Sequence, residues 1–185
     1  MAGTRRGGHA EAGTGPGGPR KSATRQNEPG GPGADHHWLA EAIELSRRCP
    51  PSEFAFSVGA ILVGADGEAI ATGFSRERDP HDHAEEVALA KAASAGAALR
   101  LAGATLYSSL EPCAARASRP RSCAELTIAA GVRRVVIAWL EPPLFVTGGG
   151  AGMLRAAGVT VIEIPELAAE ARAVNGHLRL DESGQ

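Results

Sequence analysis

The sequence predicts an α/β protein of three layers, in which helices cover both faces of a five-stranded mixed sheet. Two observations lead to this fold class. A strand–turn–strand pattern comes early in the chain, and strands then alternate with helical segments. The chain has 185 residues, of which 43% are hydrophobic, and this is enough for one globular domain with a buried core.

The first 34 residues differ from the rest. They consist mainly of Gly, Pro, Ala, Thr and charged residues and contain no apolar side chain larger than Met1. Such a segment cannot bury enough apolar surface to offset its ordering entropy. We therefore predict a disordered tail over 1–34 and a globular domain over 35–185. The net charge of the tail, +3, is scattered, which favours an extension without a ligand over one that binds RNA or an acidic partner.

The domain is predicted to begin with a helix and a hairpin. Apolar residues recur at helical spacing behind Asp35, a candidate N-cap, and predict a helix that ends near Cys49. A buried apolar run over 57–63 and a second strand over 69–73 flank a turn that contains Gly67. This arrangement is typical of a β-hairpin, so the sheet is expected to be mixed.

The remaining elements alternate. Runs rich in Val and Ile indicate strands, and glycines that follow apolar periodic segments indicate where helices end. On this basis we predict strands over 105–110, 134–140 and 159–164, and helices over 87–95, 124–130, 153–157 and 166–178.

Charge and cysteine content exclude several classes of protein. The formal net charge of −2 argues against a dedicated nucleic-acid binder, because such proteins use basic surfaces to contact phosphates. Three cysteines cannot build a disulfide framework and fit a reducing compartment or a metal site better. There is no apolar run of the ~20 residues that span a bilayer and no apolar secretory signal. We therefore expect a cytoplasmic protein that binds neither membranes nor nucleic acid.

Three short motifs carry the chemistry. His83-Ala84-Glu85 opens a helix, Pro112-Cys113 follows a strand, and Cys123 begins the next helix. One imidazole and two thiolates suit Zn²⁺ and leave a fourth coordination position for water, as catalytic zinc requires. Glu85, two residues after the histidine, can act as a proton shuttle without being a ligand. The alternative, a surface histidine with two buried thiols or a disulfide, does not explain why these motifs occur in this order.

These motifs are similar to the signature of zinc nucleobase deaminases, although nine residues separate the two cysteines instead of the common two. The domain further resembles the deaminase half of the bifunctional riboflavin-biosynthesis deaminase/reductases. The resemblance is carried by the stretches 40–48, 58–63, 110–113, 129–136 and 154–161, and by 171–177 with Asn175. It implies a cytidine-deaminase-like fold, zinc held by His83, Cys113 and Cys123, catalysis by Glu85, and a homodimer. No reductase half follows, so an NADPH site is not expected.

Several departures from that family concern the substrate. The usual Asn-Pro-x-Val before the first strand is replaced by a stretch that contains Phe54 and Phe56, and the Asp-Pro-Asn-Pro after the fourth strand is replaced by Glu141-Pro142-Pro143-Leu144. The loop between the cysteines is one residue longer, and only Arg119 keeps an analogous place. Arginines in this loop could grip a phosphate or could simply be solvated. The expected substrate contacts are Phe54, Phe56, Ala84, Glu111, Pro112, Arg116 and Arg119.

The sequence thus predicts a zinc-dependent hydrolytic deaminase of an aminopyrimidine or related heterocycle that releases ammonia. Because the specificity elements differ, we expect a substrate other than the riboflavin-pathway compound; that pathway compound is the first alternative. A nucleic-acid editing deaminase is disfavoured by the seven aromatic residues and the charge of −5 that remains outside the tail. A catalytically silent zinc scaffold is disfavoured because it would not need Glu85.

Overall fold

The computed structural model describes residues 30–140 and 149–178. Along the chain the elements are α1 (Pro32–Ser46), β1 (Gly59–Val63), β2 (Ala69–Phe74), α2 (Ala84–Ser94), the 3-10 helix η1 (Ala98–Gly103), β3 (Thr105–Ser108), α3 (Cys123–Ala129), β4 (Arg134–Ile137), α4 (Gly150–Ala156), β5 (Thr160–Glu163), the 3-10 helix η2 (Pro165–Leu167) and α5 (Ala168–Val174).

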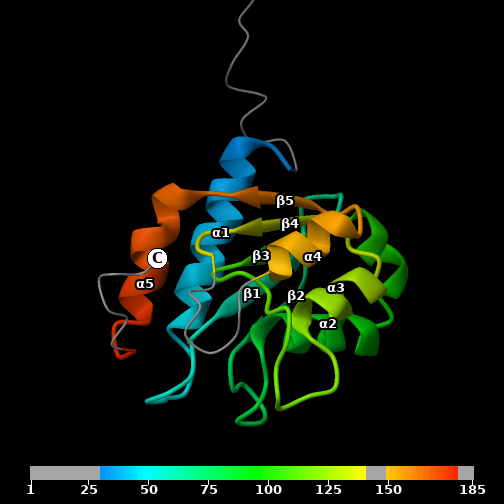
Figure 1. The fold of residues 1–185 in the computed structure, drawn as a ribbon. Coiled ribbons are helices and arrows are strands. Elements are labelled where there is room, and N and C mark those ends of the chain that lie inside the picture. Colours follow the sequence, from blue (N-terminus) through cyan, green and yellow to red (C-terminus); the bar gives the residue numbers. More distant parts are fainter. Residues whose placement is uncertain (1–29, 141–148, 179–185) are drawn as a thin grey trace, which may run out of the picture.

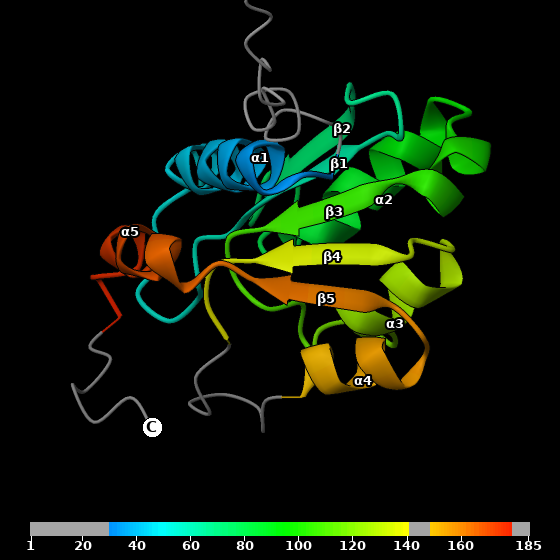
Figure 2. The ribbon, with the colours of Figure 1, turned by 90° about the horizontal axis from the view of Figure 1, so that it is seen from above.

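The five strands form one mixed sheet in the order β2-β1-β3-β4-β5 (Figure 2). β1 runs antiparallel to β2 and β3, whereas β3, β4 and β5 are parallel to one another. All five residues of β1 are buried, as expected of a strand covered on both faces. The predicted five-stranded mixed sheet is confirmed.

Helices cover the two faces of the sheet unequally. α1 and α5 pack together on one face, and α2, α3 and α4 form the layer on the other (Figure 1). Two glycines allow the close approach: a Cβ at Gly59 would lie 2.1 Å from the Ala42 carbonyl oxygen of α1, and one at Gly73 would lie 2.3 Å from that of Ala84 in α2. Gly73 thereby brings the first turn of α2 against the sheet.

Some predicted boundaries differ from the structure. α1 begins at Pro32, so Asp35 is not its N-cap but a buried residue of its first turn. The tail prediction otherwise falls on residues 1–29, outside the described residues. The predicted strands 57–63, 105–110 and 134–140 extend two or three residues beyond the ladder, because most of the flanking residues, such as Val58, Leu110 and Trp139, are buried although they lie outside the sheet. The last helix is split into η2 and α5, and η1 was not predicted.

Two features of this fold position the site. The chain leaves β3 at Ser108 toward Cys113, and the first residues of α2 and α3 lie on the same side of the sheet.

Within the part of the chain that the structure covers, no helix is long and apolar enough to span a membrane.

Candidate metal centre and active site

His83, Cys113 and Cys123 come together although 40 residues of sequence separate the first from the last. The Nδ1 atom of His83 lies 3.6 Å from the Sγ atom of Cys113 and 3.5 Å from that of Cys123. The two cysteines are buried and His83 is partly buried. The structure thus confirms that the three predicted ligands converge.

Local structure explains this convergence. His83 is the extended N-cap residue of α2, and Cys123 is the first residue of α3. α3 begins there because Ser122 and Glu125 form a capping box, in which each side chain accepts a hydrogen bond from the other residue's backbone N–H. The backbone N–H of Cys123 points to the Cys113 sulfur at 3.4 Å, and that of Ala124 donates to the Cys113 carbonyl oxygen at 3.1 Å.

The geometry and chemistry of this donor set fit zinc. Tetrahedral zinc with Zn–S bonds of about 2.3 Å and Zn–N bonds of about 2.1 Å requires the nitrogen and each sulfur to lie roughly 3.5 Å apart, which agrees with the measured distances. The two thiols differ in acidity because they share a hydrogen bond. This bond lowers the pKa of the acceptor Cys113 and raises the pKa of the donor Cys123. Three protein ligands leave the fourth coordination position to a water molecule.

Glu85 lies next to this centre with only 3% of its surface exposed. Burial raises the pKa of its carboxyl group, against the opposing effect of the positive charge of His83. Its Oε1 atom accepts a hydrogen bond of 2.9 Å from the hydroxyl of Ser108, the last residue of β3. A buried carboxyl group with a raised pKa, held in one orientation, is suited to receive and return a proton.

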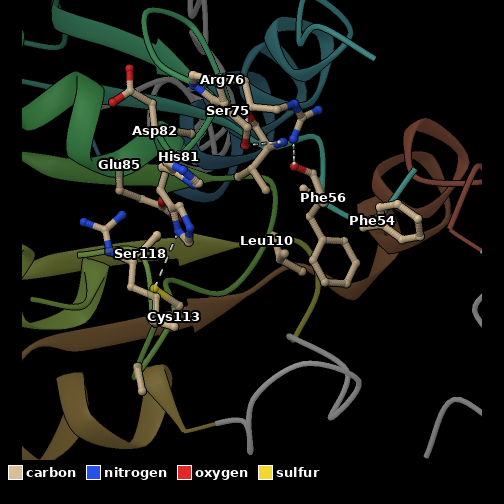
Figure 3. A pocket seen from close by; sticks show the side chains of 18 of the residues that line it. Phe54, Phe56, Ser75, Arg76, His81, Asp82, Glu85, Leu110, Cys113 and Ser118 are labelled. Carbon is tan, nitrogen blue, oxygen red and sulfur yellow. Dashed lines mark hydrogen bonds between the residues drawn. The ribbon is translucent and has the colours of Figure 1, made fainter. Parts of the chain in front are cut away.

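A cavity of about 380 Å³ opens in front of Glu85 (Figure 3). Cys113 and Glu85 lie on one side of it, and Phe54, Phe56 and Leu110 line the other. His83, in contact with Cys113, also lines the cavity. The ring of Phe56 packs edge-on against Trp139, with 5.7 Å between ring centroids. The cavity therefore has a polar, metal-binding side and an apolar, partly aromatic side, which is the usual character of a site for a small heterocycle.

Residues 32–139, more than half of the chain, match the family described as the cytidine and deoxycytidylate deaminase zinc-binding region. The chain belongs to this deaminase family. The predicted class of enzyme, a deaminase that hydrolyses C–N bonds, the predicted fold and the predicted zinc-binding set are confirmed by this membership together with the convergence of the triad.

Similar proteins of known function belong to the riboflavin pathway. The diaminohydroxyphosphoribosylamino-pyrimidine deaminase of Schizosaccharomyces pombe is 39% identical over 126 residues, which cover 68% of this chain and 31% of that protein. The riboflavin biosynthesis protein RibD of Escherichia coli is 35% identical over 131 residues, which cover 69% of this chain and 33% of that protein. The chain thus spans about a third of the length of these relatives.

A solved structure agrees with these relatives. The diaminohydroxyphosphoribosylaminopyrimidine deaminase/5-amino-6-(5-phosphoribosylamino)uracil reductase of Thermotoga maritima superposes with a TM-score of 0.65 at 35% identity. The match covers 77% of this chain and 39% of that protein. The resemblance to riboflavin-pathway deaminases that the motifs indicated is therefore confirmed.

Five of the seven predicted substrate contacts of this deaminase domain line the cavity: Phe54, Phe56, Ala84, Glu111 and Arg116. Pro112 and Arg119 are not among the lining residues. The carbonyl oxygen of Pro112 faces Gly150 at the start of α4, where a Cβ would lie 1.6 Å from it. The Glu111 carboxylate accepts a hydrogen bond of 2.6 Å from the backbone N–H of Ala151. Both residues thus tie the segment before Cys113 to α4.

Two arginines of the loop between the cysteines, Arg116 and Arg119, are paired with carboxylates of the chain itself. Arg116, whose side chain is 5% exposed, donates to Glu86 at 3.0 Å. Arg119 lies 3.2 Å from Asp79 and 3.6 Å from both Asp82 and Glu86. These pairs join the loop between the two cysteines to the segment that carries His83. Substrate contact remains a prediction for Arg116, because it borders the cavity.

Two residues of the site were not predicted from the sequence. Ser108 orients Glu85, but a serine at the end of a strand gives no pattern that reveals this role. Arg76 borders the cavity and adopts a left-handed backbone conformation that no local motif indicates. His81 is exposed and also lines the cavity.

Proposed function

We propose that the chain deaminates diaminohydroxyphosphoribosylaminopyrimidine, the substrate for which its 39% identical relative is named. The observation that carries the proposal is this identity across a region that includes the triad and Glu85. The riboflavin-pathway compound was the first alternative of the sequence analysis. The relatives support it better than the changed substrate that the departures in Phe54, Phe56 and the cysteine loop suggested.

The residues of the site can perform the required hydrolysis. Zinc bound by His83, Cys113 and Cys123 would supply an activated water, because metal binding lowers the pKa of bound water to about 7. The Glu85 carboxylate accepts a proton and delivers it to the ring nitrogen beside the reacting carbon. A C–O bond forms, the C–N bond to the exocyclic amine breaks, and ammonia leaves without any change in oxidation state. We expect the backbone at Glu111, which lines the cavity, to accept a hydrogen bond from that amine.

The two sides of the cavity suit the two parts of this substrate. A planar diaminopyrimidine is apolar on its faces and can lie against Phe56 and Leu110, while its edge points to Glu85. The phosphoribosyl group would extend toward the exposed side of the cavity, where the His81 ring offers a hydrogen-bond donor. A small-molecule substrate is therefore proposed, and nucleic acid is not.

The proposal is tested by measuring ammonia release from the pathway compound beside cytidine, cytosine, guanine and an aminopteridine. We expect efficient turnover of the pathway compound alone. A Cys113→Ser preparation, purified in the same way, serves as the control for contaminating deaminases. Turnover of a different heterocycle with none of the pathway compound would reject the proposal in favour of a changed substrate.

A further inference from the structure

Arg76 follows β2 in an unfavourable backbone conformation. Its φ angle is 61°, and among the described residues it is the sole non-glycine residue with a positive φ. Non-glycine residues adopt this region rarely, and such strain persists only where the surrounding structure enforces it. Glycine would adopt this conformation without cost. The side chain of Arg76 must therefore do something that glycine could not.

The contacts of that side chain show what this is. The guanidinium group donates four hydrogen bonds: two to the carbonyl oxygen of Pro50, at 3.0 and 2.8 Å, one of 2.8 Å to that of Phe56, and one of 3.0 Å to the hydroxyl of Ser57. The three acceptor atoms of these four bonds belong to residues 50–57, which contain no helix or strand. We call residues 50–57 the aromatic segment, since it carries Phe54 and Phe56.

The backbone of Arg76 is tied to the other side of the cavity. Its N–H donates to the carbonyl oxygen of Asp82 at 2.9 Å, and Asp82 directly precedes the ligand His83. One residue thus bridges the aromatic segment and the turn that carries a zinc ligand. Figure 3 shows Arg76 between these two sides, with Phe56 beyond its guanidinium group. The residue with the left-handed backbone conformation is therefore the one that connects the aromatic segment to the turn before His83.

We propose that Arg76 is a positioning residue that fixes the distance between the aromatic segment and the metal centre, and thereby determines how well a planar heterocycle fits the cavity. Asn175, the C-cap residue of α5, holds the same segment: its side chain accepts a hydrogen bond of 2.7 Å from the Ser57 N–H and donates one of 3.1 Å to the Ser57 carbonyl oxygen. Arg76 is the corresponding support on the cavity side. The proposal rests on the proposed function only for the choice of substrate.

The test compares Arg76→Gly with Arg76→Lys and with Arg100→Gly, a control at an exposed ion pair to Asp66. Arg76→Gly removes the four hydrogen bonds and also the backbone strain, so its melting temperature should stay close to that of the wild type. Its KM should rise about tenfold, since the loss of an aromatic contact to a base typically weakens binding by roughly 5- to 150-fold. Its kcat should change by less than about twofold, because Glu85 and the triad keep their own supports. The KM of Arg76→Lys should lie between that of the wild type and that of Arg76→Gly.

A second measurement needs no substrate. The amides of Phe54, Ala55 and Ser57, which bond to Ser52 and Asn175 side chains, should exchange hydrogen about tenfold faster in Arg76→Gly and at the wild-type rate in Arg100→Gly. Bound zinc should be unchanged in all variants.

The outcomes separate this inference from the proposed function. If the wild type prefers another heterocycle, the KM comparison is made with that compound, and the exchange result is unaffected. A raised KM with unchanged exchange would show that Arg76 touches the substrate instead of positioning the segment. Faster exchange with unchanged KM would show that the segment does not govern substrate fit. Either result would overturn the proposal, as would no change in both.

Discussion

Single residues of the active site differ in whether they hold the metal or move the proton. Glu85→Gln should keep about one equivalent of zinc and a wild-type melting temperature, because Gln can still accept the Ser108 hydrogen bond and a neutral side chain suits a buried position. Turnover should fall by roughly 10²–10⁴-fold, the usual contribution of a general acid–base group. Elemental analysis and ammonia release measure the two effects.

The matched control for this prediction is Cys113→Ser. It removes a ligand of the triad and should lose most of the zinc together with the activity. If Glu85→Gln also lost its zinc, Glu85 would be part of the metal site and not a proton shuttle. Near-normal turnover of Glu85→Gln would exclude it from the mechanism altogether.

Residue-scale reasoning from the sequence succeeded where the chemistry depends on a local motif. His83 and Glu85 lie two residues apart at the start of a helix, and the sequence displays this directly. It could not show that Arg116 pairs with Glu86, because 30 residues separate them and any loop arginine could equally face solvent. Ser108 escaped prediction for the same reason, since its partner comes from another element.

At the scale of elements, hydrogen bonds to the buried carboxylate of Asp35 connect α1 to two strands. Asp35 in α1 accepts hydrogen bonds from the Tyr107 hydroxyl of β3, at 2.9 Å, and from Arg134 of β4, at 2.8 Å. Sequence analysis assigned Asp35 to the helix N-cap, because a cap and a buried anchor look alike when the distant partners are unknown. The strand ends were overextended for a related reason: Leu110 remains buried after the backbone has left the ladder.

This network predicts a pH dependence that one variant can isolate. Burial, and then the hydrogen bond to Asp35, raise the pKa of Tyr107 well above its usual value of 10. A raised pKa means that the folded chain keeps the proton longer than the unfolded chain does. The stabilisation is therefore complete below about pH 10 and is lost as the pH rises further.

Urea unfolding of the wild type and Tyr107→Phe at pH 7 and pH 10.5 measures this effect. Tyr107→Phe should be less stable by about 1 kcal/mol at pH 7, the typical net value of a hydrogen bond, and the difference should shrink at pH 10.5. Since Tyr107 is the single tyrosine of the chain, its ultraviolet absorbance also reports ionisation directly. A difference that stays constant with pH would contradict the assignment.

At the scale of the whole molecule, we expect a homodimer, as the family resemblance implied. The α2 and α3 layer presents small exposed side chains such as Ala93 and Ala129, which let a second helix layer approach closely. Light scattering after size exclusion should report twice the mass of the chain at micromolar concentration. A monomer under these conditions would contradict the expectation.

The architecture, a five-stranded mixed sheet between layers of helices, was the most predictable property of this molecule, because hydrophobic periodicity and the hairpin turn at Gly67 are local signals. The shape of the cavity was the least predictable. Arg76, which borders it, holds the aromatic segment by hydrogen bonds to residues that lie 19 to 26 positions away in the sequence.

The anchoring of α1 has a practical consequence for attaching the protein to a surface. Arg134 donates to the carbonyl oxygen of Gly30 and pairs with Asp35, so residue 30 is held beside the first residues of β3 and β4. The cavity lies beyond the opposite ends of these strands, past Ser108. A biosensor tether joined to the chain at Gly30 would therefore leave from the edge away from the cavity mouth, and an immobilised sample should bind heterocycles as it does in solution.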